Sequence, residues 1–134
     1  LDSKGLLLSD RKMEDYKRGF AQARERVAGW KVKGAIPTLL ETIQNAKATA
    51  LLGLSGQGGA FDETSVRALA ANTARPIVFP LSNPTSRAEC TPDQAREWTG
   101  GRAIVATGIE DITADVLSMS VADNASETSA AAVG

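Results

Sequence analysis

Three polar or glycine-rich segments hold the side chains that could do chemistry. Asp2 is a carboxylate that can accept hydrogen bonds from ribose hydroxyls, although an aspartate just ahead of a glycine is also common in turns. Residues 55–59, SGQGG, allow a ligand to approach the backbone closely, or else form a flexible turn between a strand and a helix. Asn83 offers amide donors and an acceptor, and Pro84 restricts its backbone, but the pair also fits a simple Asx turn.

Two neighbouring cations follow the first of these segments. Lys17 and Arg18 have the charge needed to bind a 2′-phosphate on a cofactor. The alternative is an exposed helix surface on which Glu14 or Asp15 neutralises them. The residue types alone leave both interpretations open.

The composition excludes several kinds of site. The 134 residues include no histidine, which excludes Ser-His-Asp catalysis and HExxH metal sites. Cys90 is the only cysteine, so neither an internal disulfide nor a cysteine-rich zinc site can form. A net charge of −1 argues against a nucleic-acid binder, and no apolar run approaches the roughly 20 residues that span a bilayer.

The elements that must position these residues alternate along the chain. Short apolar runs predict strands, and the run at 49–54 is typical of a strand buried on both faces. This alternation predicts an α/β fold with a parallel sheet, whose ligands bind at the carboxyl ends of the strands. The strands are expected over 49–54, 76–81 and 102–108, and the helices over 13–26, 37–46, 62–73, from Thr91 to about Gly100, and from Thr113 onward.

The first predicted helix depends on one stripe of side chains. Met13, Tyr16, Phe20 and Val27 follow one another at three-, four- and seven-residue steps. Such spacing predicts one continuous helix that buries these residues together.

Five segments, taken in their order along the chain, resemble the cofactor-binding domain of malic enzymes. The most specific is RPIVFPLSNPT over residues 75–85, followed by AECT at 88–91. The others are DSKGL at 2–6, LGLSG with GAF within 52–61, and GRAIVATG at 101–108. The resemblance implies a Rossmann-like parallel sheet with helices on both faces. The sheet would be incomplete, because the phosphate-binding GxGxxG motif occurs nowhere in the chain.

The resemblance also implies an activity. Malic enzymes use NAD or NADP with Mg or Mn to convert L-malate to pyruvate and CO2. Their catalytic lysine and tyrosine and their metal-binding carboxylates have no counterpart here, so no catalytic or metal-binding residue is expected in this chain. The expected protein is a cytoplasmic homo-oligomer that binds neither nucleic acid nor membranes. A malolactic-type enzyme, or a non-catalytic nucleotide-fold fragment, is the alternative.

The family's contact positions can be carried onto matching residues. Asp2 matches the residue at the adenosine ribose, and Ser3 with Lys17 resembles members that prefer NADP. Asn83 matches an amide that contacts the nicotinamide ribose and malate, and it is the one expected substrate contact. The remaining expected cofactor contacts are Leu54, Ser55, Gly56, Leu81 and Ser82.

The resemblance ends at Gly108. Residues 1–108 are expected to form the distal part of the NAD(P)-binding domain, and 109–134 a C-terminal helix with a frayed tail. The family continues differently after Gly108, so we expect a deletion or a gap at the Gly108–Ile109 junction. The start at Leu1 reads as a cut from a longer protein.

Overall fold

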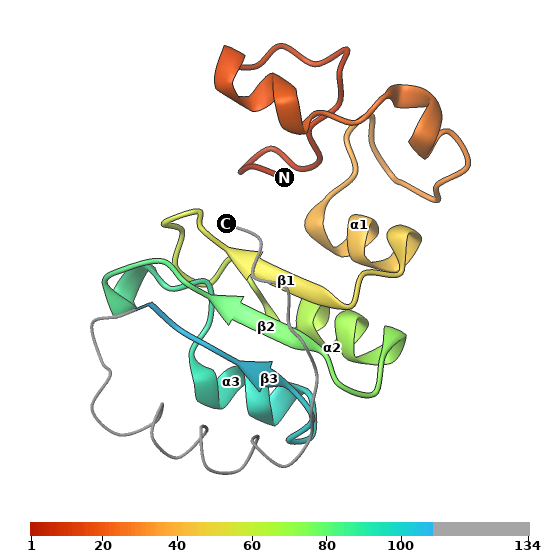
Figure 1. Ribbon diagram of the computed structural model, residues 1–134. Helices are drawn as coiled ribbons and strands as arrows, with labels where there is room; N and C mark the ends of the chain where they lie inside the picture. The colour runs from red at the N-terminus through yellow and green to blue at the C-terminus, as the bar shows by residue number, and fades with distance from the viewer. Residues whose placement is uncertain (109–134) are drawn as a thin grey trace.

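Three short parallel strands form the centre of the fold in the computed structural model, which describes residues 1–108 (Figure 1). The strands are β1 (Ala50–Gly53), β2 (Ile77–Pro80) and β3 (Ile104–Val105), arranged in the order β1-β2-β3. This arrangement confirms the predicted parallel sheet. The helix expected from Thr113, and the whole 109–134 segment, lie outside the described residues.

Three α-helices begin within two residues of their predicted starts. A threonine or aspartate precedes each one, and its side chain accepts a hydrogen bond from an amide in the first turn. Such caps each stabilise a helix by about 1 kcal/mol. The longest helix among residues 1–108 has ten residues, and none there is long and apolar enough to cross a membrane. The helices are α1 (Leu39–Ala46), α2 (Glu63–Asn72) and α3 (Pro92–Trp98), capped by Thr38, Asp62 and Thr91.

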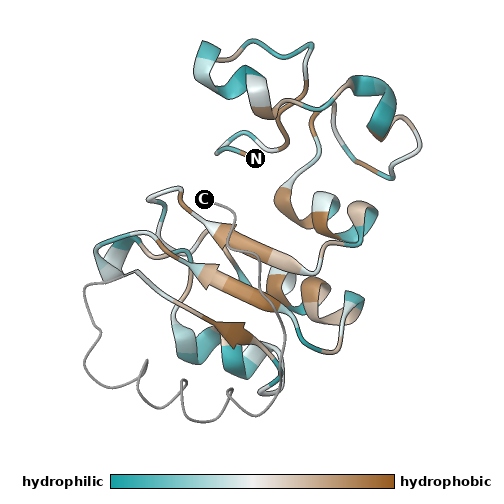
Figure 2. Cartoon of the chain, in the orientation of Figure 1, coloured by the Kyte–Doolittle hydropathy of each residue, from teal (hydrophilic) through white to brown (hydrophobic). Residues whose placement is uncertain are grey.

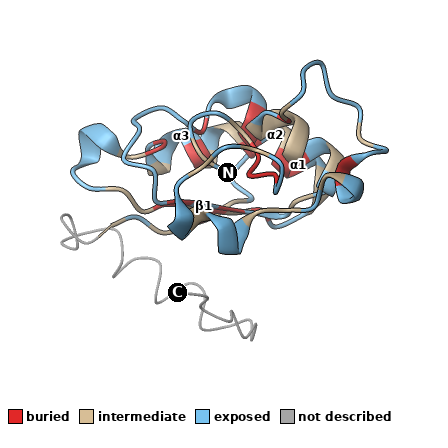
Figure 3. Ribbon diagram, turned by 90° about the horizontal axis from the view of Figure 1, so that it is seen from above, coloured by how far each residue is buried: buried red, intermediate tan, exposed pale blue. Residues whose placement is uncertain are grey.

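The hydrophobic core lies on one face of this sheet. Leu51 pairs in register with Val78, which pairs with Val105, so all three side chains point to the same side. They pack with one or more buried residues from every α-helix, namely Ile43 of α1, Val66 and Leu69 of α2, and Ala95 of α3. Seen from above, the three helices lie together on one side of the strands (Figure 3).

The opposite face of the sheet is apolar and largely uncovered within residues 1–108. Leu52 is 50% exposed and Leu54 is 78% exposed, while Phe79 is half-buried. The three strands are made mostly of hydrophobic residues (Figure 2). The prediction that 49–54 is buried on both faces is therefore wrong for residues 1–108. Helices were expected on both faces of the sheet, and the three α-helices among these residues lie on one face. Alternate side chains of a strand point to opposite faces, so helices on one side cover only every second residue.

The segment before α1 differs from its prediction. In place of one helix over 13–26, it forms two short 3-10 helices, η1 (Asp15–Phe20) and η2 (Arg24–Val27). Between them the backbone of Gln22 pairs with the strand-like residues around Leu8. The Gln22 N–H donates to the Leu7 carbonyl at 2.8 Å, and the Gln22 carbonyl accepts the Ser9 N–H at 2.9 Å.

This pairing explains why the predicted helix breaks. A residue that pairs across to another segment must be extended, and an extended residue cannot continue a helix. As a result Tyr16 and Phe20 are 73% and 74% exposed, although their spacing predicted burial. Only Val27 of the predicted stripe is buried, where it packs with Leu6 and Leu8.

The one-sided core predicts unequal effects of the same truncation on the two faces. Leu69→Ala should lower the free energy of unfolding by about 2–5 kcal/mol, because Leu69 is completely buried. Leu52→Ala should cost less than about 1.5 kcal/mol, since the side chain is half exposed. Urea denaturation followed by circular dichroism measures both values. Equal losses would contradict the one-sided core.

Candidate cofactor-binding site at the strand ends

Two of the three predicted ligand-binding loops leave the sheet side by side. Gly53, at the end of β1, pairs with Pro80, at the end of β2, so both strands stop at the same level. Leu54–Gly56 follows β1, and Leu81–Asn83 follows β2. Leu54 and Asn83 are exposed, whereas Leu81 and Ser82 are half-buried. The structure thus brings six of the nine predicted contact residues to one edge.

A buried carboxylate joins these two loops. Glu89 is completely buried, and its Oε1 accepts hydrogen bonds from the Ser55 N–H at 2.9 Å and the Ser55 hydroxyl at 2.8 Å. The same oxygen accepts the Ser82 hydroxyl at 2.6 Å. Ser82 in turn accepts the Gly56 N–H at 2.9 Å, which connects the loops directly.

These hydrogen bonds keep Glu89 charged. Burial by itself raises the pKa of the carboxyl, but the hydrogen bonds from Ser82 and Ser55 outweigh it, so the pKa lies below its usual range. The backbone makes room for the group at the end of β1, where a Cβ on Gly53 would collide with the Glu89 carboxylate.

Glu89 lies in the AECT segment of the family motif but is not among the predicted site residues. Its partners are 7 and 34 residues away along the chain. Spacing rules for a single helix or strand therefore cannot detect it. The available signal is a carboxylate placed directly before the buried Cys90 and the cap of α3.

The loop after β3 reaches the same edge. A Cβ on Gly108 would collide with the Asn83 side-chain oxygen and with the Leu81 carbonyl. Only glycine therefore fits this approach without a shift of the loops. Gly56, with φ of +64°, also has a backbone conformation that favours glycine.

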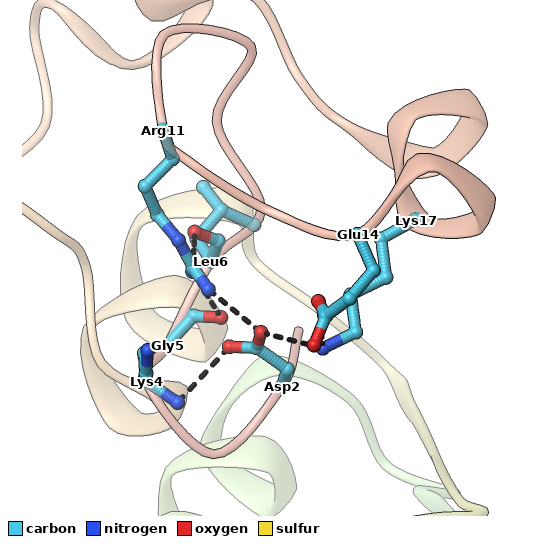
Figure 4. A network of polar contacts seen from close by, with 7 residues as sticks. All are labelled: Asp2, Lys4, Gly5, Leu6, Arg11, Glu14 and Lys17. Carbon is cyan, nitrogen blue, oxygen red and sulfur yellow. Dashed lines mark hydrogen bonds and ion pairs between the residues drawn. The ribbon is translucent and has the colours of Figure 1, made fainter.

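Asp2 belongs to a different cluster, within the N-terminal segment (Figure 4). Its Oδ1 accepts the Lys4 N–H at 3.0 Å. Its Oδ2 accepts hydrogen bonds from the Arg11 guanidinium at 2.6 Å and the Lys17 ammonium at 3.3 Å. Lys17 also pairs with Glu14 at 2.9 Å. The hydrogen bonds and ion pairs of Asp2 thus link it to residues 4–17, and Ser3 lies exposed beside it.

The charges of this cluster stabilise one another. Partial burial raises the pKa of Asp2, but Arg11, the Lys4 amide and Lys17 lower it more, to about 2. The Glu14 carboxylate, aided by Asp2, raises the pKa of Lys17. Arg18 pairs with Asp15 at 3.2 Å on the exposed surface. The alternative interpretation of Lys17 and Arg18, in which acidic neighbours neutralise them, is thus met for both cations.

The donor set does not fit a metal site. Among residues 1–108, no three of the His, Cys, Asp and Glu side chains lie close enough together to hold a metal ion. Asp2 and Glu89 are each engaged by other partners. Cys90 is buried, and burial raises the pKa of its thiol to about 11, so it is a poor thiolate ligand.

Comparison with known proteins decides the family. Residues 1–124 match the family model described as "Malic enzyme, NAD binding domain". The chain belongs to the malic enzyme family. The match confirms the resemblance and the incomplete Rossmann-like fold. It also runs beyond Gly108, while the expected gap at the Gly108–Ile109 junction stays a prediction.

Bacterial relatives support the same assignment for this malic enzyme segment. It is 50% identical over 94 residues to the NAD-dependent malic enzyme of Acinetobacter baylyi, covering 70% of this chain and 17% of the relative. The Shewanella denitrificans enzyme is 48% identical over 93 residues (69% and 16%), and the Edwardsiella ictaluri enzyme 43% over 104 residues (76% and 18%). The chain therefore spans less than a fifth of the length of these relatives.

The Asp2 cluster predicts a pH-dependent contribution to stability. Because the folded pKa of Asp2, about 2, lies below the ordinary value of 3.8, its ion pairs contribute fully above about pH 4. This contribution disappears as the pH falls towards 2. The difference in unfolding free energy between wild type and Asp2→Asn should therefore be positive at pH 6 and shrink through this range.

Urea titrations at a series of pH values measure this difference. Asp93→Asn is a matched control, since it removes the same charge from a fully exposed side chain of α3 that pairs with Arg96 at 3.5 Å. The control should cost little at pH 6. A wild-type advantage over Asp2→Asn that stays constant down to pH 2 would argue against the ion-paired Asp2.

Proposed function

We propose that this chain is the NAD-contacting segment of a malic enzyme that converts L-malate to pyruvate and CO2. The observation that carries the proposal is the joining of the loops after β1 and β2 by Glu89 and Ser82 at the carboxyl ends of the strands. In open α/β sheets, nucleotides bind at such an edge. The names of the bacterial relatives support the reaction.

The contacts that we propose are divided between the two loops. The exposed segment Leu54–Gly56 would lie along the dinucleotide, while Leu81 and Ser82 would line the nicotinamide. The exposed Asn83 amide can donate and accept, so it would hold both the nicotinamide ribose and malate. NAD supplies the hydride acceptor when bound, and these residues bind and orient it.

We further propose NAD rather than NADP as the cofactor. The relatives are named NAD-dependent. A 2′-phosphate would also have to compete for Lys17 with two carboxylates, those of Asp2 and Glu14. The resemblance of Ser3 and Lys17 to NADP-preferring members is the reason to test both cofactors.

We place the groups that move protons and hold Mg or Mn outside residues 1–108. L-malate as substrate, the homo-oligomer and the cytoplasmic location remain predictions. The relatives' names do not favour the malolactic alternative. Our proposal expects the longer protein to turn over L-malate, whereas the alternative of a non-catalytic fragment expects no turnover. A malate assay of the longer protein therefore separates the two.

The isolated chain should therefore be inactive. We expect no malate-dependent reduction of NAD or NADP at 340 nm by the 134-residue chain with Mg or Mn present. Measurable turnover would show that this chain contains the catalytic groups that we place elsewhere.

Asn83 provides the test of the site in a complete enzyme. In a full-length malic enzyme carrying this segment, Asn83→Ala should lower kcat/KM for malate by about tenfold to hundredfold, the effect of losing hydrogen bonds to a polar ligand. Gln44→Ala is the matched control, since it removes an exposed amide from α1. Normal malate kinetics in Asn83→Ala would remove Asn83 from the site.

A further inference from the structure

Glu89 is a buried charge that none of the proposed contacts uses. It is completely buried, and it accepts hydrogen bonds from residues of both cofactor loops. Its carboxylate lies behind the two serines, so it is held in the interior behind the loops that would face the cofactor. We propose that Glu89 is a positioning residue that sets the shape of both loops for NAD, an inference that rests on the proposed function.

The first argument is the direction of the hydrogen bonds. An ionised carboxylate only accepts, so both serine hydroxyls must donate to it. Their oxygen lone pairs are then free to accept from the loop backbone. Ser82 accepts the Gly56 N–H at 2.9 Å, and Ser55 accepts the Gln57 N–H at 3.2 Å.

Two relays therefore run from the glycine-rich loop to one carboxylate. One passes from the Gly56 amide through Ser82, and the other from the Gln57 amide through Ser55. Hydrogen bonds to an ionised group are roughly twice as strong as neutral ones. The charge on Glu89 thus holds successive amides of the loop in a single arrangement.

The second argument is the space reserved for the carboxylate. Gly53 ends β1, and a Cβ there would overlap three atoms of the Glu89 side chain. Glu89 is further anchored by its own backbone, whose carbonyl accepts the Phe61 N–H at 3.0 Å. The carboxylate is thus held between the β1 loop, the β2 loop and the segment leading to α2.

Glu89→Gln is the direct test in a full-length malic enzyme that carries this segment. The amide keeps the size of the side chain but loses its charge and one acceptor. We expect KM for NAD to rise about tenfold with a smaller change in kcat, because ground-state binding of the cofactor depends on the loop. Hydrogen exchange of a peptide containing residues 55–58 should also become faster without NAD.

Thr99→Val is the control for a merely structural effect. Thr99 is buried and lies away from both loops. Its hydroxyl donates a hydrogen bond to the Ala95 carbonyl at 2.7 Å and accepts one from the Ala103 N–H at 3.0 Å. This variant should unfold more easily yet keep the wild-type KM for NAD. An equal rise of KM in Thr99→Val would show that general loss of stability causes the effect, and it would overturn the proposal.

Ser55→Ala keeps the test decisive if Glu89→Gln does not fold. It leaves the carboxylate in place and breaks the Gln57 relay, so KM for NAD should rise about threefold with faster exchange at 55–58. Wild-type KM and wild-type exchange in whichever of these variants folds would overturn the positioning role alone. A wild-type enzyme that neither binds nor reduces NAD would overturn the proposed function, and the role of Glu89 with it.

Discussion

The parallel pairing of β1 with β2 is the constraint on which the rest of the structure depends. It aligns Leu51 with Val78, which directs both side chains into the core beneath the helices. The same register aligns Gly53 with Pro80, so that both strands stop together. A shift of one residue would turn the core side chains to the other face and separate the loops. Core and candidate site are thus two results of one register.

The buried charge of Glu89 lies where this register ends. An unpaired carboxylate in that place would cost several kcal/mol, because water no longer solvates it. Ser55 and Ser82 offset this cost with hydroxyl and backbone donors, and both follow strand ends that the register brings together. Within residues 1–108, no buried side-chain nitrogen or oxygen lacks a hydrogen-bond partner. The interior accepts a charge here because two separate loops supply the donors.

The sequence predicts this fold best where the signals are local. The predicted helix start at Thr91 lies next to the helix that it caps, and apolar runs mark all three strands. The prediction fails where contacts between distant segments determine the local structure. The helix expected over 13–26 breaks because Gln22 pairs with Leu8, a contact that no periodicity within 13–26 contains.

The candidate site shows the same division between local and distant signals. Loop positions after β1 and β2 follow from the motif, whereas the link through Glu89 depends on partners up to 34 residues away. The one-sided burial of β1 is also beyond a local pattern. A continuous apolar run such as TALLGL, residues 49–54, looks the same whether one face or both faces are covered.

Asp2 and Glu89 show two ways to keep a carboxylate charged, and the difference bears on which can touch a ligand. Asp2 is partly exposed, and two of its partners are the long side chains of Arg11 and Lys17. An ionised carboxylate has about four acceptor sites, and Lys4, Arg11 and Lys17 occupy three of them, so Asp2 can still accept an incoming hydroxyl. Glu89 is closed in by short serines and by backbone, so a ligand cannot replace its partners without unfolding the loops. Asp2 can therefore act by contact, whereas Glu89 can act only through the residues that it holds.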